Sequence, residues 1–172
     1  MTFRDFLGHA EKLCDDARRA REPWFAHPYV IGSILISWMS IEAFIDKLAQ
    51  DSTLLKVFST HELGFIREKQ VKFETSGKKA GDFYLSNASH YIRLEDKILF
   101  LLARFGKSGV IDKGSPLWQR FNEMKRKRNS LAHPKAGNDI TVSIKDAEDA
   151  IMVVRALIDF VSSEVLERPM KW

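Results

Sequence analysis

Apolar residues recur every three or four positions along most of this chain, which is the spacing of one face of an α-helix. No segment shows a convincing alternation of apolar and polar residues, the pattern typical of a half-buried strand. The spacing predicts helices over the ranges 2–21, 24–50, 87–105, 115–133 and 143–166, and the range 61–71 is compatible with a further short helix. We therefore expect an all-α fold, a single-domain bundle of about five helices spanning residues 1–172.

Capping residues place several of the helix ends. Ser115 followed by Pro116 is a strong helix start, because serine caps the first turn and proline is favoured at the first helical position. Ser143, with Asp146 three residues later, is a weaker signal of the same kind. Pro134 disfavours helical angles in the residue before it, so the helix that begins after Ser115 must end near position 133.

The composition is that of a globular protein, with 45% hydrophobic and 29% charged residues. The net charge of +4 fits an anionic partner, nucleic acid first, and fits equally well a basic surface kept for solubility. The single cysteine, Cys14, excludes an internal disulfide and a cysteine-rich zinc site. The sequence has no glycine-rich phosphate loop, zinc motif of paired histidines or serine nucleophile elbow, so we expect neither a metal nor a cofactor. The polar segment 74–82 is expected to be a loop.

The amino-terminal residues lack the apolar core of a signal peptide. The most apolar run, 30–41, is interrupted by a glycine and serines and is shorter than the roughly 20 residues that span a bilayer. We therefore expect a cytoplasmic protein without a membrane partner.

The apolar stripe of the helix predicted at 115–133 contains an arginine. The residues of this stripe, spaced by three or four, are Leu117, Phe121, Met124, Arg128 and Leu131. An arginine at such a position must find a carboxylate or another anion, because an unpaired buried charge is costly. The stripe should therefore face the core or a partner that offers an anion.

Asn129 and His133 are four residues apart, so they share a second helical face next to Arg128. His133 falls at the carboxyl end of the helix, where the helix dipole favours the imidazolium form, and Pro134 can turn the imidazole toward Arg128. RNA cleavage without a metal needs a base for the 2′-hydroxyl, an acid for the leaving 5′-oxygen and a cation for the phosphorane. The segment therefore offers a histidine, a permanent cation and an amide for this chemistry.

A structural interpretation of the same residues stays open. Arg128 would form an interhelical ion pair, and His133 would cap the carboxyl end of its helix. An arginine with a histidine five residues later also arises by chance, and Arg4 with His9 repeats the spacing in the first predicted helix. That copy lacks the following asparagine and the proline, and we interpret it as part of the surface.

The run from Arg128 to Pro134, Arg-Asn-Ser-Leu-Ala-His-Pro, resembles the signature of the HEPN superfamily, an arginine with a polar neighbour and a histidine a few residues later. As in that family, the signature closes one helix, and a short loop leads to the next helix at Ser143. Upstream, the segment 38–46, Trp-Met-Ser-Ile-Glu-Ala-Phe-Ile-Asp, resembles the long family helix that often carries an acidic residue. The resemblance is strong over 115–166, fair over 28–50 and 88–105, and absent over 51–87.

The resemblance implies a helical bundle that forms a homodimer, with two signatures facing each other across a shared cleft. Many family members are metal-independent endoribonucleases of toxin–antitoxin, phage-defence and RNA-processing systems. Carried over, His133 would be the acid/base group, Arg128 would bind the phosphate and stabilise the phosphorane, and Asn129 would be a positioning residue. Glu42 would support Arg128 by a hydrogen bond, or would belong with Asp46 to a solvated or capping pair. The expected partners are a second copy of the chain, an RNA substrate and an antitoxin or regulatory protein.

Four basic residues flank the signature and are candidates for contacts with the RNA backbone: Lys125, Arg126, Lys127 and Lys135. A run of charges is as often only a solvated face of a helix. Lys135 is also a departure from the family, because toxin members that are controlled by a nucleotidyltransferase antitoxin often have a tyrosine at this place. The alternative function is a non-catalytic HEPN module that binds a partner protein, a nucleotide or RNA without cutting it.

Overall fold

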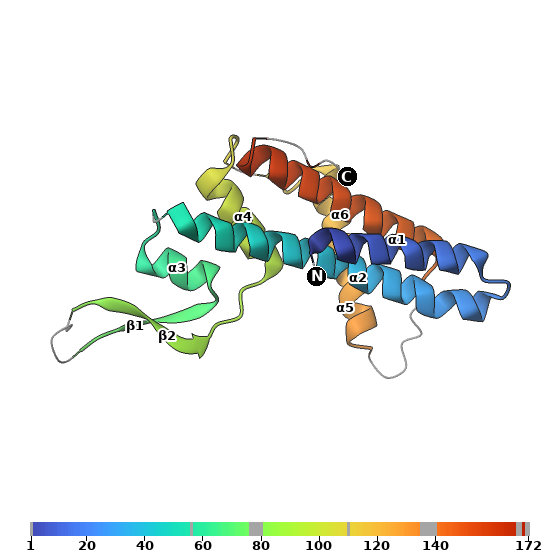
Figure 1. The fold of residues 1–172 in the computed structure, drawn as a ribbon, viewed down its shortest axis with the longest axis horizontal. Helices are drawn as coiled ribbons and strands as arrows, with labels where there is room; N and C mark the ends of the chain where they lie inside the picture. The colour runs from blue at the N-terminus through green and yellow to red at the C-terminus, as the bar shows by residue number, and fades with distance from the viewer. Residues whose placement is uncertain are drawn as a thin grey trace. The chain divides into compact units, whose positions relative to one another are not determined.

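A computed structural model describes residues 2–55, 57–75, 81–109, 111–134, 141–167 and 170. This part of the chain forms mainly helices, and its elements follow in the order α1 (Phe3–Arg19), α2 (Pro23–Ser52), the 3₁₀-helix η1 (Thr53–Leu55), α3 (Thr60–Ile66), β1 (Lys69–Phe73), β2 (Phe83–Ser89), α4 (Leu94–Phe105), α5 (Pro116–Ala132) and α6 (Ile144–Val165) (Figure 1). The predicted all-α class is confirmed, with one small two-stranded sheet added to it.

The predicted capping residues begin the helices. The Ser115 side chain accepts a hydrogen bond from the backbone of Trp118 and starts α5, with Pro116 at its first position. Ser143 and Asp146 form a reciprocal capping box at the start of α6, because each side chain accepts from the other residue's backbone N–H. These boundaries are confirmed because they depend on local backbone hydrogen bonds, which the sequence specifies directly.

Contacts divide the chain into two compact units, each described here by itself. The first, which we call the bundle unit, comprises residues 1–44 and 102–172, and the second, the hairpin unit, comprises residues 45–101. The single domain that we expect over 1–172 stays a prediction.

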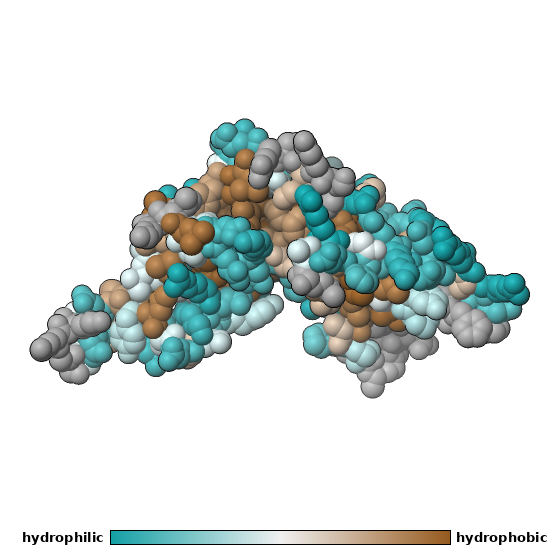
Figure 2. Space-filling model, in the orientation of Figure 1, coloured by the Kyte–Doolittle hydropathy of each residue, from teal (hydrophilic) through white to brown (hydrophobic). Residues whose placement is uncertain are grey.

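In the bundle unit, α1 and the first part of α2 run antiparallel and close together. Two buried serines of α2 allow this approach: Ser33 donates to the carbonyl of Ala10 at 2.8 Å, and Ser40 donates to that of Phe3 at 2.7 Å. Helix α6 packs on α1, and these helices lie side by side in Figure 1. The outer face of α1 is mostly hydrophilic (Figure 2). The side chains most completely buried in this unit include Ile34, Ile41, Phe121, Leu157 and Ile158.

The hairpin unit contains the fold's main departure from the sequence prediction. Strands β1 and β2 pair antiparallel, with Val71 opposite Leu85 and Phe73 opposite Phe83. One face of this hairpin packs against α3 at Gly64, where an added Cβ would overlap Val71 and lie 3.3 Å from Leu85. The expectation that no strand is present was therefore wrong, because the strands are stabilised by pairing and by this close approach of α3. For the same reason the helix predicted from position 87 begins only at Leu94.

A partly buried lysine links three elements of the hairpin unit. The Lys97 ammonium lies 2.8 Å from the Asp46 carboxylate and 3.0 Å from that of Glu68, with only 10% of its side chain exposed. Burial by itself would lower the pKa of the Lys97 amine, but the hydrogen bonds that its ammonium donates to Asp46 and Glu68 hold that pKa above its ordinary value. Asp46 therefore belongs to this ion-pair cluster, and not to a solvated pair with Glu42.

Helix α2 is longer than the apolar run in the sequence suggests. Its part from His27 to Ser52 contains an 18-residue window with a mean hydropathy of 1.5, and by length and composition this part could cross a membrane. Half of the most apolar window is buried inside the protein, and the core helix of a soluble protein meets the same criterion. The location of the protein stays a prediction.

Candidate active site

The residues of the Arg128–His133 segment occupy the end of α5. The helix ends at Ala132, and the His133 backbone leaves the helical region with φ of −133° and ψ of 66°. Its N–H still donates to the Asn129 carbonyl at 3.0 Å. Arg128 and Asn129 are therefore held by a regular helix, whereas His133 begins the connection to α6, as Pro134 predicts.

Arg128 lies at the margin of the apolar stripe of α5. Its side chain is 29% exposed, whereas Phe121 and Met124 of the same stripe are buried. The guanidinium carbon lies 5.6 Å from the ring centroid of Trp38 on α2. Trp38 in turn stacks on Phe121, with 5.3 Å between centroids and 11° between ring planes. The flat cation is thus supported by an aromatic surface that is anchored in the core.

Glu42 lies next to both of these side chains. Its Oε1 accepts a hydrogen bond from Trp38 Nε1 at 2.6 Å and lies 3.9 Å from Nη2 of Arg128. At this distance Glu42 is a long ion pair for Arg128, not the hydrogen-bond acceptor that we expected. Because both side chains are partly exposed, the pair contributes little stability. The interhelical ion pair of the structural interpretation is therefore present, but only in this weak form.

The sequence analysis did not identify Trp38 as part of this site. Trp38 is 4% exposed, and it both supports the Arg128 cation and fixes Glu42. The available signal was the spacing of Trp38 and Glu42, which are four residues apart and therefore neighbours on one face of α2.

Asn129 and His133 are both exposed near the carboxyl end of α5. Nη1 of Arg128 donates to Oδ1 of Asn129 at 3.1 Å, which is the one hydrogen bond of the guanidinium within the described residues. The His133 side chain has no hydrogen bond or ion pair to any residue that the structure describes. The structure thus joins Arg128 to Asn129 and to Glu42, and it leaves the imidazole and most guanidinium N–H donors available to an added anion.

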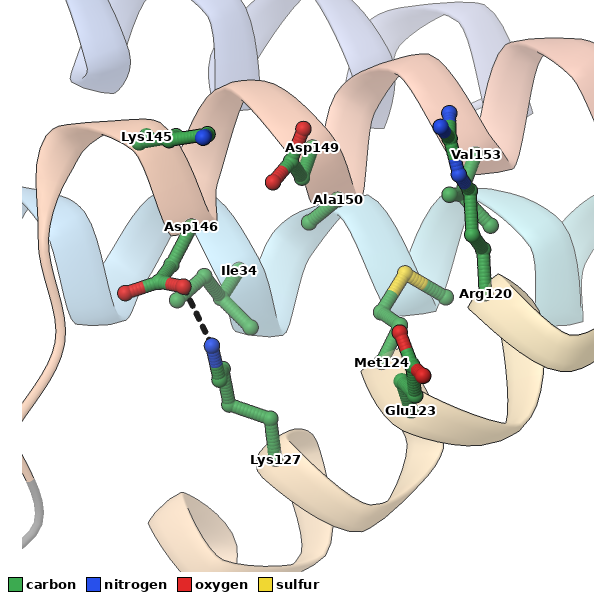
Figure 3. Close-up of a pocket in the computed structure, with 10 residues that line it drawn as sticks. All are labelled: Ile34, Arg120, Glu123, Met124, Lys127, Lys145, Asp146, Asp149, Ala150 and Val153. Carbon is green, nitrogen blue, oxygen red and sulfur yellow. Dashed lines mark hydrogen bonds and ion pairs between the residues drawn. The ribbon is translucent and has the colours of Figure 1, made fainter.

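The basic residues around the signature differ in their surroundings. Lys127 forms an ion pair with Asp146 on α6 and points toward it across a cavity of about 250 Å³ between α5 and α6 (Figure 3). Arg126 is exposed and Lys125 is half-buried. Lys127 is therefore engaged within the protein, and Arg126 is the better placed of the three for a phosphate contact.

Two further observations bear on the chemistry of the site. The predicted backbone contact Lys135 lies outside the described residues. Among the described residues, no group of three or more histidine, cysteine, aspartate or glutamate side chains is placed to hold a metal ion.

Comparison of the chain with family models, with curated proteins and with solved structures finds no match.

Proposed function

We propose that this protein is a metal-independent endoribonuclease of the HEPN type. The observation that carries the proposal is the environment of Arg128, a guanidinium held against Trp38 but with only one hydrogen bond in the described residues. Such a cation is positioned by the fold and still has donors for a phosphate. Its neighbours Asn129 and His133 are exposed at the same helix end.

The proposed reaction is a transesterification within the RNA backbone. A base takes the proton of the 2′-hydroxyl, and the 2′-oxygen attacks the adjacent phosphorus. The bond to the 5′-oxygen then breaks, and an acid gives that oxygen its proton. The products are a 2′,3′-cyclic phosphate and a 5′-hydroxyl, with no net gain or loss of protons.

The residues of the site fit these steps as follows. His133 transfers one of the two protons, because it is the exposed histidine at the same end of α5 as Arg128. In a homodimer, His133 of the partner subunit transfers the other. Arg128 stabilises the negative charge that accumulates on the phosphorane, where a fixed cation has its largest effect on the rate. Asn129 orients the guanidinium through its 3.1 Å hydrogen bond.

The second candidate function is a non-catalytic module that binds a partner protein, a nucleotide or RNA. The observation in its favour is that no hydrogen bond joins His133 to Arg128 within the described residues. The two functions differ in whether His133 is needed for bond cleavage. A toxin or phage-defence role, with an antitoxin or another regulatory protein as partner, would follow from the first function.

The test is cleavage of a labelled single-stranded RNA in EDTA by wild type and by His133→Ala. We expect the wild type to leave a cyclic phosphate and His133→Ala to lose at least about a hundredfold in rate, because general acid–base catalysis contributes on that scale. His9→Ala is the matched control, since His9 is exposed and follows Arg4 at the same spacing. If His133→Ala cuts as fast as wild type, or if EDTA stops the reaction, the proposal is wrong. If the wild type binds RNA but cuts none of a broad panel, the non-catalytic module is the better description.

A further inference from the structure

A shallow cavity of about 410 Å³ lies in the hairpin unit, between α3 and the base of the hairpin. Its lining includes polar groups that can donate hydrogen bonds, namely His61, Lys69, Gln70 and His90. Phe65 and Val71 contribute apolar side chains to the wall of the cavity. No residue of the lining is acidic.

The carboxylates nearest in sequence already have partners within the hairpin unit. Glu68 lies at the edge of the cavity, where its Oε1 accepts from the backbone N–H of the lining residue Ile92 at 3.4 Å, and its charge is balanced by Lys97 at 3.0 Å. Glu62 accepts from the backbone N–H of Ser59 in the capping box of α3. Glu74 and Asp82 lie at the loop end of the hairpin, beyond the strands. The cavity therefore favours an anion, and Lys69 has N–H donors beyond the one that bonds to the Asn87 carbonyl at 3.2 Å.

Exposed aromatic rings adjoin this cavity. The ring of Phe83 lies 4.6 Å from that of His61, which lines the cavity, and 5.2 Å from that of Phe73. Phe83 and Phe73 are 49% and 52% exposed, although both lie on the hairpin face that packs against α3. Large aromatic rings that remain half in solvent beside a cationic cavity are suited to stacking with a base.

We propose that this face of the hairpin unit binds single-stranded RNA, with a backbone phosphate at Lys69, His61 and His90 and an unpaired base on Phe83. The proposal rests on the ribonuclease function, since that function makes RNA the ligand. Single strands fit because only an unpaired base offers its face to a protein ring. The opposite face of the hairpin, with Lys72 opposite Tyr84, provides a lysine and an aromatic residue outside the proposed site.

The test is the affinity of the full chain for a fluorescein-labelled single-stranded RNA of about ten nucleotides, measured by fluorescence anisotropy at several salt concentrations. All proteins carry His133→Ala so that the probe stays intact. We expect Lys69→Gln to weaken binding several-fold and to reduce the salt slope by about 0.7, the value for one phosphate contact on a single strand. We expect Phe83→Leu, which keeps an apolar side chain but removes the ring, to weaken binding about tenfold.

The matched controls are Lys72→Gln and Tyr84→Leu on the opposite face of the hairpin. They should leave the affinity within about twofold of the parent, because each removes the same kind of group from outside the site. Thermal melting of every variant shows whether the hairpin unit still folds. Gln at position 69 can still donate to the Asn87 carbonyl, so we expect this variant to fold.

Three results would overturn the inference. The first is that the variants on both faces of the hairpin lose RNA affinity equally. The second is that the parent protein binds a duplex of the same sequence as tightly as the single strand. The third is that the parent protein binds no RNA. If light scattering instead shows self-association that Phe83→Leu abolishes, in a protein that binds no RNA, the face is an interface between copies of the chain. Because the readout is binding by a protein without His133, these results are independent of whether the wild type cleaves RNA.

Discussion

The guanidinium of Arg128 takes part in three interactions, and none of them is strong. It donates one hydrogen bond to the neutral amide of Asn129, lies 3.9 Å from a partly exposed Glu42, and rests 5.6 Å from the Trp38 centroid. Because the Arg128 side chain is partly exposed to solvent, each interaction contributes on the order of 1 kcal/mol. Together they hold the direction of the side chain, and a phosphate could replace the Glu42 contact at little cost.

This arrangement predicts the effect of Arg128→Lys. Lysine keeps the positive charge but lacks the planar fork that can contact two phosphate oxygens and lie flat on Trp38. We expect the rate of RNA cleavage to fall by about a hundredfold, on the scale of losing one donor to an oxyanion. The melting temperature should change by only a few degrees, because Arg128 contributes little to stability. Arg120→Lys, at an exposed position of α5 that has no part in the proposed site, is the matched control and should retain most of the activity.

A rate for Arg128→Lys close to that of wild type would mean that a point charge is sufficient at this position. The planar recognition of a phosphate by Arg128 would then be wrong. A large fall in melting temperature would instead favour the structural interpretation, in which Arg128 stabilises the packing of α5 on α2.

The first turn of α6 is attached to the part of α5 that carries the signature. Asp146 closes the capping box with Ser143 and also pairs with Lys127, so one carboxylate joins the first turn of α6 to the last turns of α5. Burial by itself would raise the pKa of the Asp146 carboxyl, but the hydrogen bonds from Lys127 and Ser143 outweigh it and hold that pKa below its ordinary value of 3.8. Asp146 thus stabilises the folded state in its ionised form.

The pH dependence of stability follows from this pKa. Because the pKa is lower in the folded state, the stabilisation is complete above the ordinary value of 3.8 and is lost as the pH falls through the folded-state value. At neutral pH, Asp146→Asn should lower the free energy of unfolding by about 1–2 kcal/mol. Urea titrations from about pH 6 to about pH 2.5 should show this difference shrinking toward acid. Asp149→Asn, with an exposed carboxylate that has no ion pair in the described residues, should show no such difference.

A gap between wild type and Asp146→Asn that stays constant down to the lowest pH would contradict this account. The contribution of Asp146 would then come from packing or from the neutral cap. That result would also remove the argument that Lys127 is engaged with α6 and unavailable to RNA.

The proposed chemistry requires more than one copy of the chain. A single cleavage step needs both an acid and a base, and each chain has one exposed histidine in the signature. A two-fold dimer would bring two signatures to one cleft, because an isologous interface presents the same surface from both subunits. His133 at the end of α5 is accessible for such an arrangement.

Mixed dimers provide the test of this requirement. Wild type and His133→Ala are combined in different proportions, unfolded and refolded together, and assayed at constant total protein. If both histidines act in one cleft, activity should follow the square of the wild-type fraction, so that an equal mixture has about a quarter of the activity. Light scattering should give the mass of two chains for every mixture. Activity in direct proportion to the wild-type fraction would show that one signature is sufficient.

The sequence by itself determined the features that depend on neighbours along the chain. Serine, proline and the apolar spacing predict α1, α5 and α6 closely, because capping and the amphipathic pattern are local interactions. The place of Arg128 on the stripe of α5 and the helix end at His133 follow from the same local rules, whereas the partial exposure of Arg128 was visible only in the structure. The RNA-cleaving role of these residues was also read from sequence and stays a prediction.

Only the tertiary structure decided what lies next to these residues. The sequence shows neither that Trp38 supports Arg128 nor that Lys127 pairs with Asp146, because each pair joins helices distant in the chain. The β-hairpin also depends on contacts that the sequence does not show. Its alternation of apolar and polar residues is too short to recognise, and its strands gain stability only from each other and from the close approach of α3 at Gly64.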